Sequence, residues 1–263
     1  MLEQDVLVSK DGAVATITLN RPDKRNAQGV HFTPRLLAAL DAVEQDPSVH
    51  AVILTGNGPV FGGGGDLAEI MSTEETDAEE EFELVLGYNR LISRIYHFGR
   101  PIIAAVNGPA FGGGTGLALA CDFAIASETA AYHFVFARIG LSAADMGVTT
   151  LMQRAVGTTL AHYYLLTAGT IDARKGLELG LFVDVTPPGE LLAAAGRIAA
   201  GIASQSRRGT TITKMALRRG AETPFDASLE YEAYLQSFAF RSKEHKRRLG
   251  AFLESAQTRR QRN

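Results

Sequence analysis

Two glycine-rich segments constrain the fold of this chain more than any other feature. Phe61-Gly-Gly-Gly-Gly-Asp66 and Phe111-Gly-Gly-Gly-Thr-Gly116 each follow an apolar, strand-like run and precede a helix-forming segment. Clustered glycines lose much conformational entropy on folding, so their use indicates a backbone that approaches something closely. At the start of a helix, unpaired N–H groups point outward and favour negative charge. Two such turns can aim one N–H each at a single carbonyl oxygen, as an oxyanion hole does, or they can simply pack tightly together.

Strand and helix patterns alternate on either side of these segments. Val6–Val8 and Val14–Leu19 are strand-forming runs that flank a turn, and they predict a hairpin. His31–Gln45 spaces its leucines as a helix does, and Ala51–Thr55 is a short apolar run typical of a buried strand. Repeated alternation of this kind predicts an α/β fold with parallel strands and right-handed crossovers. From Pro187 onward the patterns predict helices alone.

The composition places the chain among soluble globular proteins. Its 263 residues are 46% hydrophobic and 21% charged, with a formal net charge of −3. The sequence has no apolar run long enough to cross a membrane and no leader-like start, so we expect a cytoplasmic protein without a membrane partner. The mild acidity argues against a nucleic-acid partner, because phosphate neutralisation needs a clustered basic face. A single cysteine, Cys121, cannot form an internal disulfide and fits a reducing compartment.

Several other kinds of site do not fit these residues. No lysine follows either glycine segment, which excludes a P-loop. A dinucleotide-binding fingerprint fits Gly63, Gly65 and Ala68 poorly, because the turn lies well past its strand. The stretch Gly140-Leu-Ser-Ala-Ala144 lacks the last glycine of a hydrolase nucleophile turn. The six histidines are scattered without zinc-binding spacing, so we expect no metal site.

Further short motifs occur in a fixed order along the chain. They are Asn20-Arg-Pro-Asp-Lys-Arg-Asn-Ala27, Ala51-Val-Ile-Leu-Thr-Gly56, Pro101-Ile-Ile-Ala-Ala-Val-Asn-Gly108, Leu119-Ala-Cys-Asp122 and Leu166-Thr-Ala-Gly169. With the two glycine segments, these motifs make the chain resemble the enoyl-CoA hydratase/isomerase (crotonase) superfamily over nearly its whole length. Because several linked motifs appear in the right order, the resemblance is specific.

The resemblance implies a fold, an assembly and a substrate. The fold is a crotonase-like spiral of ββα turns over residues 1–200, followed by a helical C-terminal region, residues 201–256, that builds trimers or dimers of trimers. We expect the polar and basic residues 257–263 to form a frayed tail. The implied substrate is an acyl-CoA thioester, so coenzyme A enters as part of the substrate and no separate cofactor is expected.

Matched position by position, the resemblance places an oxyanion hole at the backbone N–H groups of Gly65 and Gly113. A thioester gives up its α-proton only if the resulting enolate oxygen is stabilised, and two such donors would stabilise it. Among the implied contacts, Lys24 or Arg25 meets a phosphate of CoA. The substrate-binding residues that we expect are Gly64, Asp66, Leu67, Lys24, Arg25, Ala27, Phe136 and His133.

The chain departs from the hydratases of this superfamily at two positions. Those enzymes use two glutamates to hold the water that adds across the double bond. Here Gly116 stands at the first position and Phe136 at the second. Neither residue can transfer a proton, so ordinary hydration loses both of its usual groups.

Asp145 is the carboxylate that remains. Superfamily members that shift double bonds or displace halide carry an aspartate here, and Asp145 matches it when a one-residue insertion is accommodated. Burial beside an apolar acyl chain would raise its pKa toward the range useful for a base. The alternative is that Asp145 caps a helix beginning near Met146. Halide displacement would also need a histidine where this chain has Asn89.

These residues together predict an enoyl-CoA double-bond isomerase. Asp145 would move a proton between two carbons while Gly65 and Gly113 hold the enolate. One alternative is a hydratase or acyl-CoA hydrolase in which Asp145 or His133 activates water. Another is a non-catalytic acyl-CoA binder. The sequence does not identify the acyl group.

Overall fold

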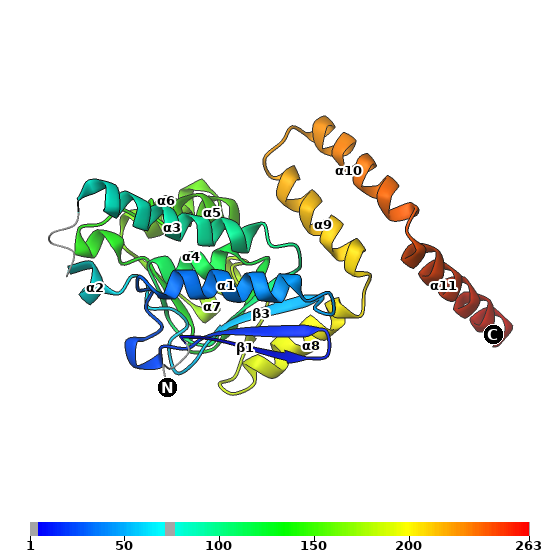
Figure 1. The fold of residues 1–263 in the computed structure, drawn as a ribbon, viewed down its shortest axis with the longest axis horizontal. Coiled ribbons are helices and arrows are strands. Elements are labelled where there is room, and N and C mark those ends of the chain that lie inside the picture. The colour runs from blue at the N-terminus through cyan, green and yellow to red at the C-terminus, as the bar shows by residue number, and fades with distance from the viewer. Residues whose placement is uncertain (1–4, 72–76, 263) are drawn as a thin grey trace. The chain divides into compact units, whose positions relative to one another are not determined.

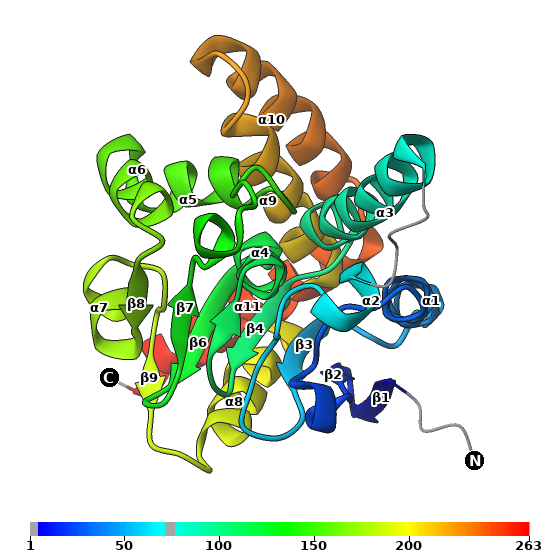
Figure 2. The same cartoon turned by 90° about the vertical axis from the view of Figure 1, so that its left-hand side faces the viewer.

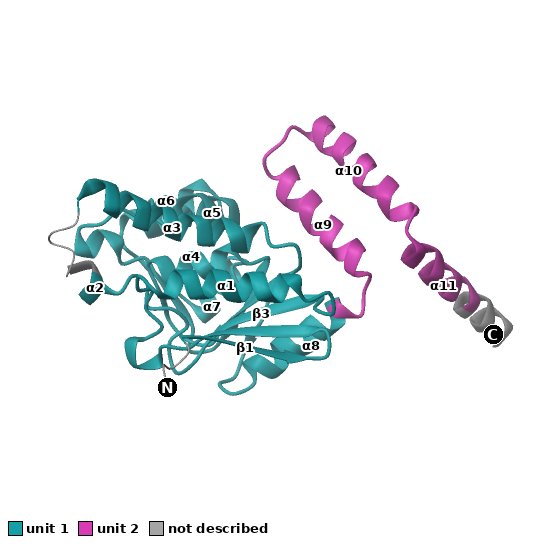
Figure 3. Ribbon diagram, in the orientation of Figure 1, with its two compact units in different colours: residues 1–202 teal, residues 203–263 magenta. Residues whose placement is uncertain are grey.

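The computed structural model describes residues 5–71 and 77–262. The chain divides into two compact units, residues 1–202 and 203–263 (Figure 3). In the first unit, a six-stranded sheet has the order β1-β2-β3-β4-β6-β9 (Figures 1 and 2). As predicted, the first two strands form an antiparallel hairpin and the other neighbouring strands pair in parallel. The strands are β1 (Val6–Asp11), β2 (Val14–Leu19), β3 (Ala51–Gly56), β4 (Ile102–Val106), β6 (Phe123–Ser127) and β9 (Val185–Thr186).

The central strands are buried on both faces, which explains their continuous apolar runs. Successive side chains of a strand point to opposite faces, so β3 divides its residues between two cores. Val52 and Leu54 belong to the larger core, which also contains residues of α1 and α3. Ala51 and Ile53 belong to a smaller core with the apolar face of α8, and Figure 1 shows α1 and α8 on opposite sides of the sheet.

The helices of the first unit connect and cover the strands. Within the described residues, no helix is long and apolar enough to span a membrane. These helices are α1 (Phe32–Gln45), α2 (Leu67–Met71), α3 (Ala78–Tyr96), α4 (Gly113–Ala120), α5 (Val148–Val156), α6 (Thr158–Leu166), α7 (Ala173–Glu178) and α8 (Leu191–Ala203), with 3-10 turns at Pro22–Lys24 and Phe136–Ile139.

A second, three-stranded sheet was only partly foreseen from the sequence. It consists of β5 (Ala110–Phe111), β7 (Ala131–His133) and β8 (Thr170–Asp172), in that order. In the sequence, Ile171-Asp-Ala173 is a plausible strand-like stretch and predicts β8, whereas no pattern predicts β5 or β7. Strands of two or three residues are too short to show the alternation that identifies a strand.

The second unit is helical, as predicted. It contains α9 (Arg207–Gly220), α10 (Phe225–Phe240) and α11 (Lys243–Arg262). Ser206 caps the first of these helices by accepting a hydrogen bond from the backbone N–H of Gly209 at 3.1 Å. The last helix extends to Arg262, and the fraying of residues 257–263 stays a prediction. Residue 263 lies outside the described residues.

The two glycine segments pack directly against each other. The backbone N–H of Phe111 donates to the carbonyl oxygen of Gly62 at 2.8 Å. A Cβ added to Gly114 would lie 2.3 Å from that same oxygen, and one added to Gly62 would lie 3.2 Å from the Cα of Gly114. Backbones can approach this closely only where neither residue carries a side chain. The contact places the first glycine turn against the start of α4.

Replacing Gly114 by alanine is expected to destabilise the fold, because the added methyl group has no space beside Gly62. We expect the free energy of unfolding to fall by about 1–3 kcal/mol in urea denaturation. Gly196→Ala within α8 is the matched control, because a Cβ there meets nothing within 4 Å. That variant should gain about 0.5–1 kcal/mol. Equal stability of the two variants would contradict the close packing.

Candidate active site

The two glycine turns leave two backbone N–H groups unpaired side by side. Within the described residues, neither the N–H of Gly65 nor that of Gly113 donates a hydrogen bond. A Cβ placed on Gly64 would lie 3.6 Å from the nitrogen of Gly113, so the first turn lies directly against the start of α4. Gly64 itself has a φ of +79°, a conformation that favours glycine. The arrangement offers two donors to one oxygen, as an oxyanion hole requires.

A third segment, residues 26–28, holds the first turn from its other side. The N–H of Gln28 donates to the carbonyl oxygen of Gly64 at 2.7 Å, and the N–H of Asp66 donates to the carbonyl oxygen of Gln28 at 3.0 Å. These two bonds flank Gly65 and fix its orientation. Asn26 is fully buried, and its side-chain amide donates to the carbonyl oxygens of Asn57 and Val60 at 2.9 and 2.7 Å.

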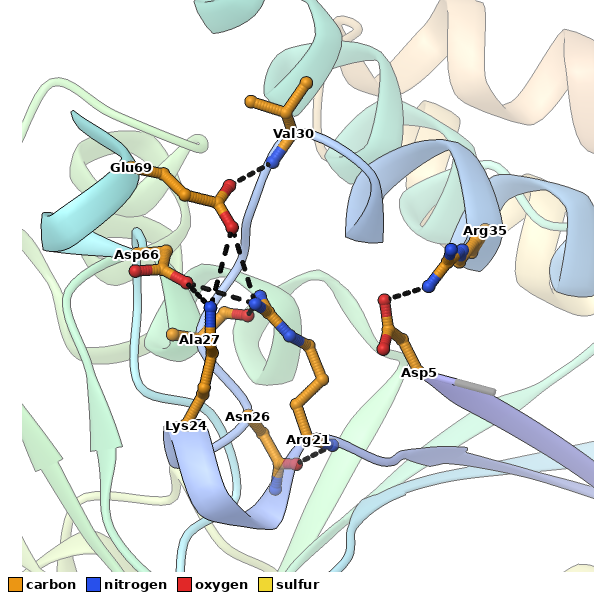
Figure 4. A network of polar contacts seen from close by, with 9 residues as sticks. All are labelled: Asp5, Arg21, Lys24, Asn26, Ala27, Val30, Arg35, Asp66 and Glu69. Atoms are coloured by element: carbon orange, nitrogen blue, oxygen red, sulfur yellow. Dashed lines mark hydrogen bonds and ion pairs between the residues drawn. The ribbon is translucent and has the colours of Figure 1, made fainter. Parts of the chain in front are cut away.

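A network of charges joins this loop to the residues just after the first turn (Figure 4). The guanidinium of Arg21 lies 3.1 Å from Asp66 and 3.4 Å from Glu69, and the ammonium of Lys24 lies 3.4 Å from Asp66. Glu69 also accepts the backbone N–H of Val30 at 2.7 Å. Burial raises the pKa of Asp66, but the hydrogen bond and charge of Lys24, with the charge of Arg21, outweigh it and hold that pKa below 3.8. Asp66 is therefore a charged structural link at the base of the turn.

Asp145 lies in a segment that crosses the first turn of α4. The next residue, Met146, contacts that turn, because its sulfur lies 2.5 Å from the Cβ position of Gly113. Burial raises the pKa of the Asp145 carboxyl, and the backbone N–H of Met146 offsets this in part. No cation of the described chain pairs with Asp145. The helix-cap alternative is wrong, because α5 begins at Val148 and its N-cap is Gly147.

Comparison with known proteins agrees with this geometry. Residues 9–261 match the family model described as enoyl-CoA hydratase/isomerase. The chain belongs to this family. The resemblance in the sequence motifs and the crotonase-like fold are thereby confirmed, with the α/β core and the helical C-terminal region that it implied.

Similar proteins carry both names of the family. A putative enoyl-CoA hydratase from Thermus thermophilus is 38% identical over 77% of this chain and 79% of its own length. A trans-2-decenoyl-[acyl-carrier-protein] isomerase from Streptococcus mutans is 30% identical over 87% of this chain and 86% of its own. The crystal structure of a putative enoyl-CoA hydratase from Streptomyces coelicolor superposes with a TM-score of 0.91 at 31% identity, covering 97% and 94% of the two chains. Several further relatives are named hydratases.

This family member has no room for a side chain at Gly116. A Cβ there would lie 2.8 Å from the backbone oxygen of Met146 and 3.1 Å from its Cβ. The second departure from the hydratase pattern, Phe136, is buried, and its ring lies 3.5 Å from the Cβ position of Gly112. At the two positions where the hydratases carry a glutamate, this chain therefore has a glycine without space for a side chain and a buried phenylalanine.

Two residues with polar tips lie near the turns in this family member. The ring of His133 stacks on Phe111 with centroids 4.5 Å apart, and its Nδ1 lies 3.0 Å from the hydroxyl of Thr170. Burial, followed by the charge of Arg138, lowers the pKa of His133. Tyr88, on α3, has its pKa raised to about 12 by burial and then by the charge of Asp145. The charge effect indicates that Tyr88 lies within electrostatic reach of Asp145.

The other expected substrate-binding residues lie beside the first glycine turn. Leu67 opens α2 and is 53% exposed. The carbonyl oxygen of Ala27 accepts a hydrogen bond from the guanidinium of Arg21 at 2.6 Å. Lys24 and Arg25 are both exposed, but Lys24 is paired with Asp66 and is not a free cation. Sequence reasoning did not single out Arg21, Asn26 and Gln28, which support the turns.

The raised pKa of Asp145 makes stability depend on pH in a defined direction. Folding favours the protonated carboxyl, so stability is complete below the ordinary pKa of 3.8 and falls as pH rises through the raised value. Asp145→Asn should therefore unfold at higher urea concentration than wild type near neutral pH. The difference should vanish at about pH 3. Asp11→Asn, at an exposed site, is the control, and a neutral-pH loss of stability in Asp145→Asn would contradict the burial effect.

Proposed function

We propose that this protein moves the double bond of enoyl-CoA thioesters, with Asp145 as the proton carrier. The observation that carries the proposal is the pairing of one partly buried carboxylate, which has no cationic partner among the described residues, with two unpaired N–H groups at the start of α4. Gly116 and Phe136 supply no second acid or base, and a glutamate at Gly116 would collide with Met146. A single carboxylate is enough for an isomerase, because the proton that leaves one carbon returns to another.

The chemistry follows from these groups. The Asp145 carboxylate takes a proton from a carbon of the enoyl chain, and the electron pair moves through the conjugated system onto the thioester oxygen. The N–H groups of Gly65 and Gly113 stabilise the enolate, and loss of one such donor typically slows a reaction by about 10²–10³-fold. Asp145 then returns the proton to a different carbon, so substrate and product have the same formula.

Coenzyme A enters this reaction as part of the substrate. We propose that its thioester oxygen accepts from the N–H groups of Gly65 and Gly113 and that its phosphates approach Lys24 and Arg25, which are exposed. Phe136 and His133 border the second turn, and Leu67 follows the first turn, so these side chains are the proposed walls for the acyl group. Arg25 is the freer of the two cations, since Lys24 is already paired with Asp66.

Hydration is the second candidate function. Most of the similar relatives are named hydratases, including those from Thermus thermophilus and Clostridium acetobutylicum, and these names favour hydration. In this chain it would need Asp145 or His133 to activate the water, because both usual glutamates are missing. An acyl-CoA binder without catalysis is the remaining candidate.

Proton exchange separates these candidates. A panel of 2-enoyl-CoA and 3-enoyl-CoA esters is incubated in heavy water with wild type and with Asp145→Asn, and the products are weighed by mass spectrometry. We expect deuterium in a product of unchanged formula, with at least about a hundredfold slower exchange in Asp145→Asn. Asp11→Asn, which removes an equal charge at an exposed site, should exchange as wild type does.

Each other outcome of that experiment has a definite meaning. A product heavier by one water would establish hydration and overturn the isomerase. Binding of the esters without exchange or water addition would favour the non-catalytic binder. Undiminished exchange in Asp145→Asn would remove Asp145 from the mechanism while leaving the enolate site in place.

We also propose that the protein assembles as a trimer or a dimer of trimers, as the family resemblance implies. The second unit exposes large aromatic side chains along α10, with Phe225 74%, Tyr234 71% and Phe238 64% exposed in the single chain. Aromatic surface of this kind marks an interaction site. Sedimentation velocity at micromolar concentration should show the trimer or hexamer, and a monomer would contradict the assembly.

A further inference from the structure

Gln28 is buried in a way that its surroundings do not explain. The residue is 1% exposed, and neither the nitrogen nor the oxygen of its side-chain amide has a hydrogen-bond partner among the described residues. An unpaired buried polar group lowers stability by about 1–3 kcal/mol, and such groups are rare in folded proteins. A methionine or leucine would fill the same space without that cost. The amide therefore calls for a partner outside the chain.

The position of Gln28 indicates what that partner is. Its backbone N–H and carbonyl oxygen bond to Gly64 and Asp66, on either side of Gly65. Its side chain reaches the second turn, where the amide oxygen lies 3.4 Å from the Cβ position of Gly113. The amide thus lies between the two turns that carry the unpaired N–H groups. A ligand atom bound by those two groups would lie next to it.

The side chain of Met146 lies against the start of α4 at Gly113. Its sulfur lies 2.5 Å from the same Cβ position of Gly113, and the residue is 2% exposed. Methionine has three rotatable side-chain bonds and adapts readily to a new neighbour. The Met146 backbone has a φ of +47°, which is uncommon for a residue other than glycine. Rotation of this one side chain would uncover the Cβ position of Gly113, beside which the amide oxygen of Gln28 lies.

We propose that Gln28 is a third hydrogen-bond donor to the thioester oxygen of the bound substrate, reached when the Met146 side chain moves aside. The inference rests on the proposed acyl-CoA function and adds a residue to it. A thioester presents only acceptors, so the amide NH₂ group faces it, not the amide oxygen. The terminal torsion of glutamine is broad, which lets the NH₂ group turn toward the ligand. The donor strengthens as charge develops on the oxygen, as a donor to an enolate must.

The substitution Gln28→Met tests this role, because it keeps the side-chain length and removes the amide. The thermal midpoint should stay unchanged or rise, since an unpaired buried group is lost. Octanoyl-CoA labelled with a heavy carbon isotope at the carbonyl is the probe for difference infrared spectroscopy. In wild type the carbonyl band should shift to lower frequency on binding, and in Gln28→Met a part of that shift should disappear. The deuterium exchange of enoyl-CoA should fall at least about tenfold in kcat/KM.

Tyr132→Phe is the matched control. The Tyr132 hydroxyl is also buried without a partner, but its ring packs on Phe182 in the core, at 5.0 Å between centroids. Its removal should leave the carbonyl band and the exchange rate as in wild type. If Gln28→Met shows the same carbonyl band shift on binding and the same exchange rate as wild type, the role of Gln28 as a third donor is overturned. Gln28→Leu gives a second reading if Gln28→Met does not fold.

The infrared measurement also separates this inference from the proposed function. If wild type does not bind octanoyl-CoA and no enoyl-CoA ester exchanges deuterium, the acyl-CoA function itself fails. If wild type binds and shifts the carbonyl band but Gln28→Met shifts it equally, the function stands and the role of Gln28 fails.

Discussion

The close contact of backbone with backbone between Gly62 and Gly114 is the constraint on which the site depends. It places the first glycine turn against the start of α4 with no side chain between them. Residues 26–28 then bind the first turn from the opposite side through main-chain hydrogen bonds. The donors of the site are therefore positioned by peptide groups, which are stiffer than side chains. A donor fixed before the substrate arrives needs no reorganisation during the reaction.

Two aspartates near the turns have opposite electrostatic surroundings. Asp66 is buried beside Arg21 and Lys24, and these cations hold its pKa low. Asp145 is partly buried without a cation, and its pKa is raised. The first therefore remains ionised and ties the loop to the turn, whereas burial makes the second hold its proton more tightly than a free aspartate does. The two carboxyl groups differ in proton affinity because of their neighbours alone.

The sequence predicts the elements that carry a repeating pattern. It does not predict features that depend on contacts between residues distant in the chain. The hairpin, the parallel core strands, the two turns and the C-terminal helices follow from periodicity and glycine content, and the structure has them all. The strands β5 and β7 are too short to carry a pattern. Asn26 and Gln28 could not be singled out, because their importance comes from burial and from partners distant in sequence. The contact of Met146 with Gly116 likewise needed coordinates.

The space at Gly116 limits how this protein could acquire a different activity. Because the main chain of Met146 fills the volume that a glutamate side chain would need, one mutation at residue 116 cannot add the missing acid. The segment before α5 would have to change its path first, and that change would also move Asp145, which lies next to Met146. A glutamate at residue 116 and the present position of Met146 and Asp145 therefore exclude each other within one backbone. A variant with an acid at residue 116 must combine changes in two parts of the sequence about 30 residues apart.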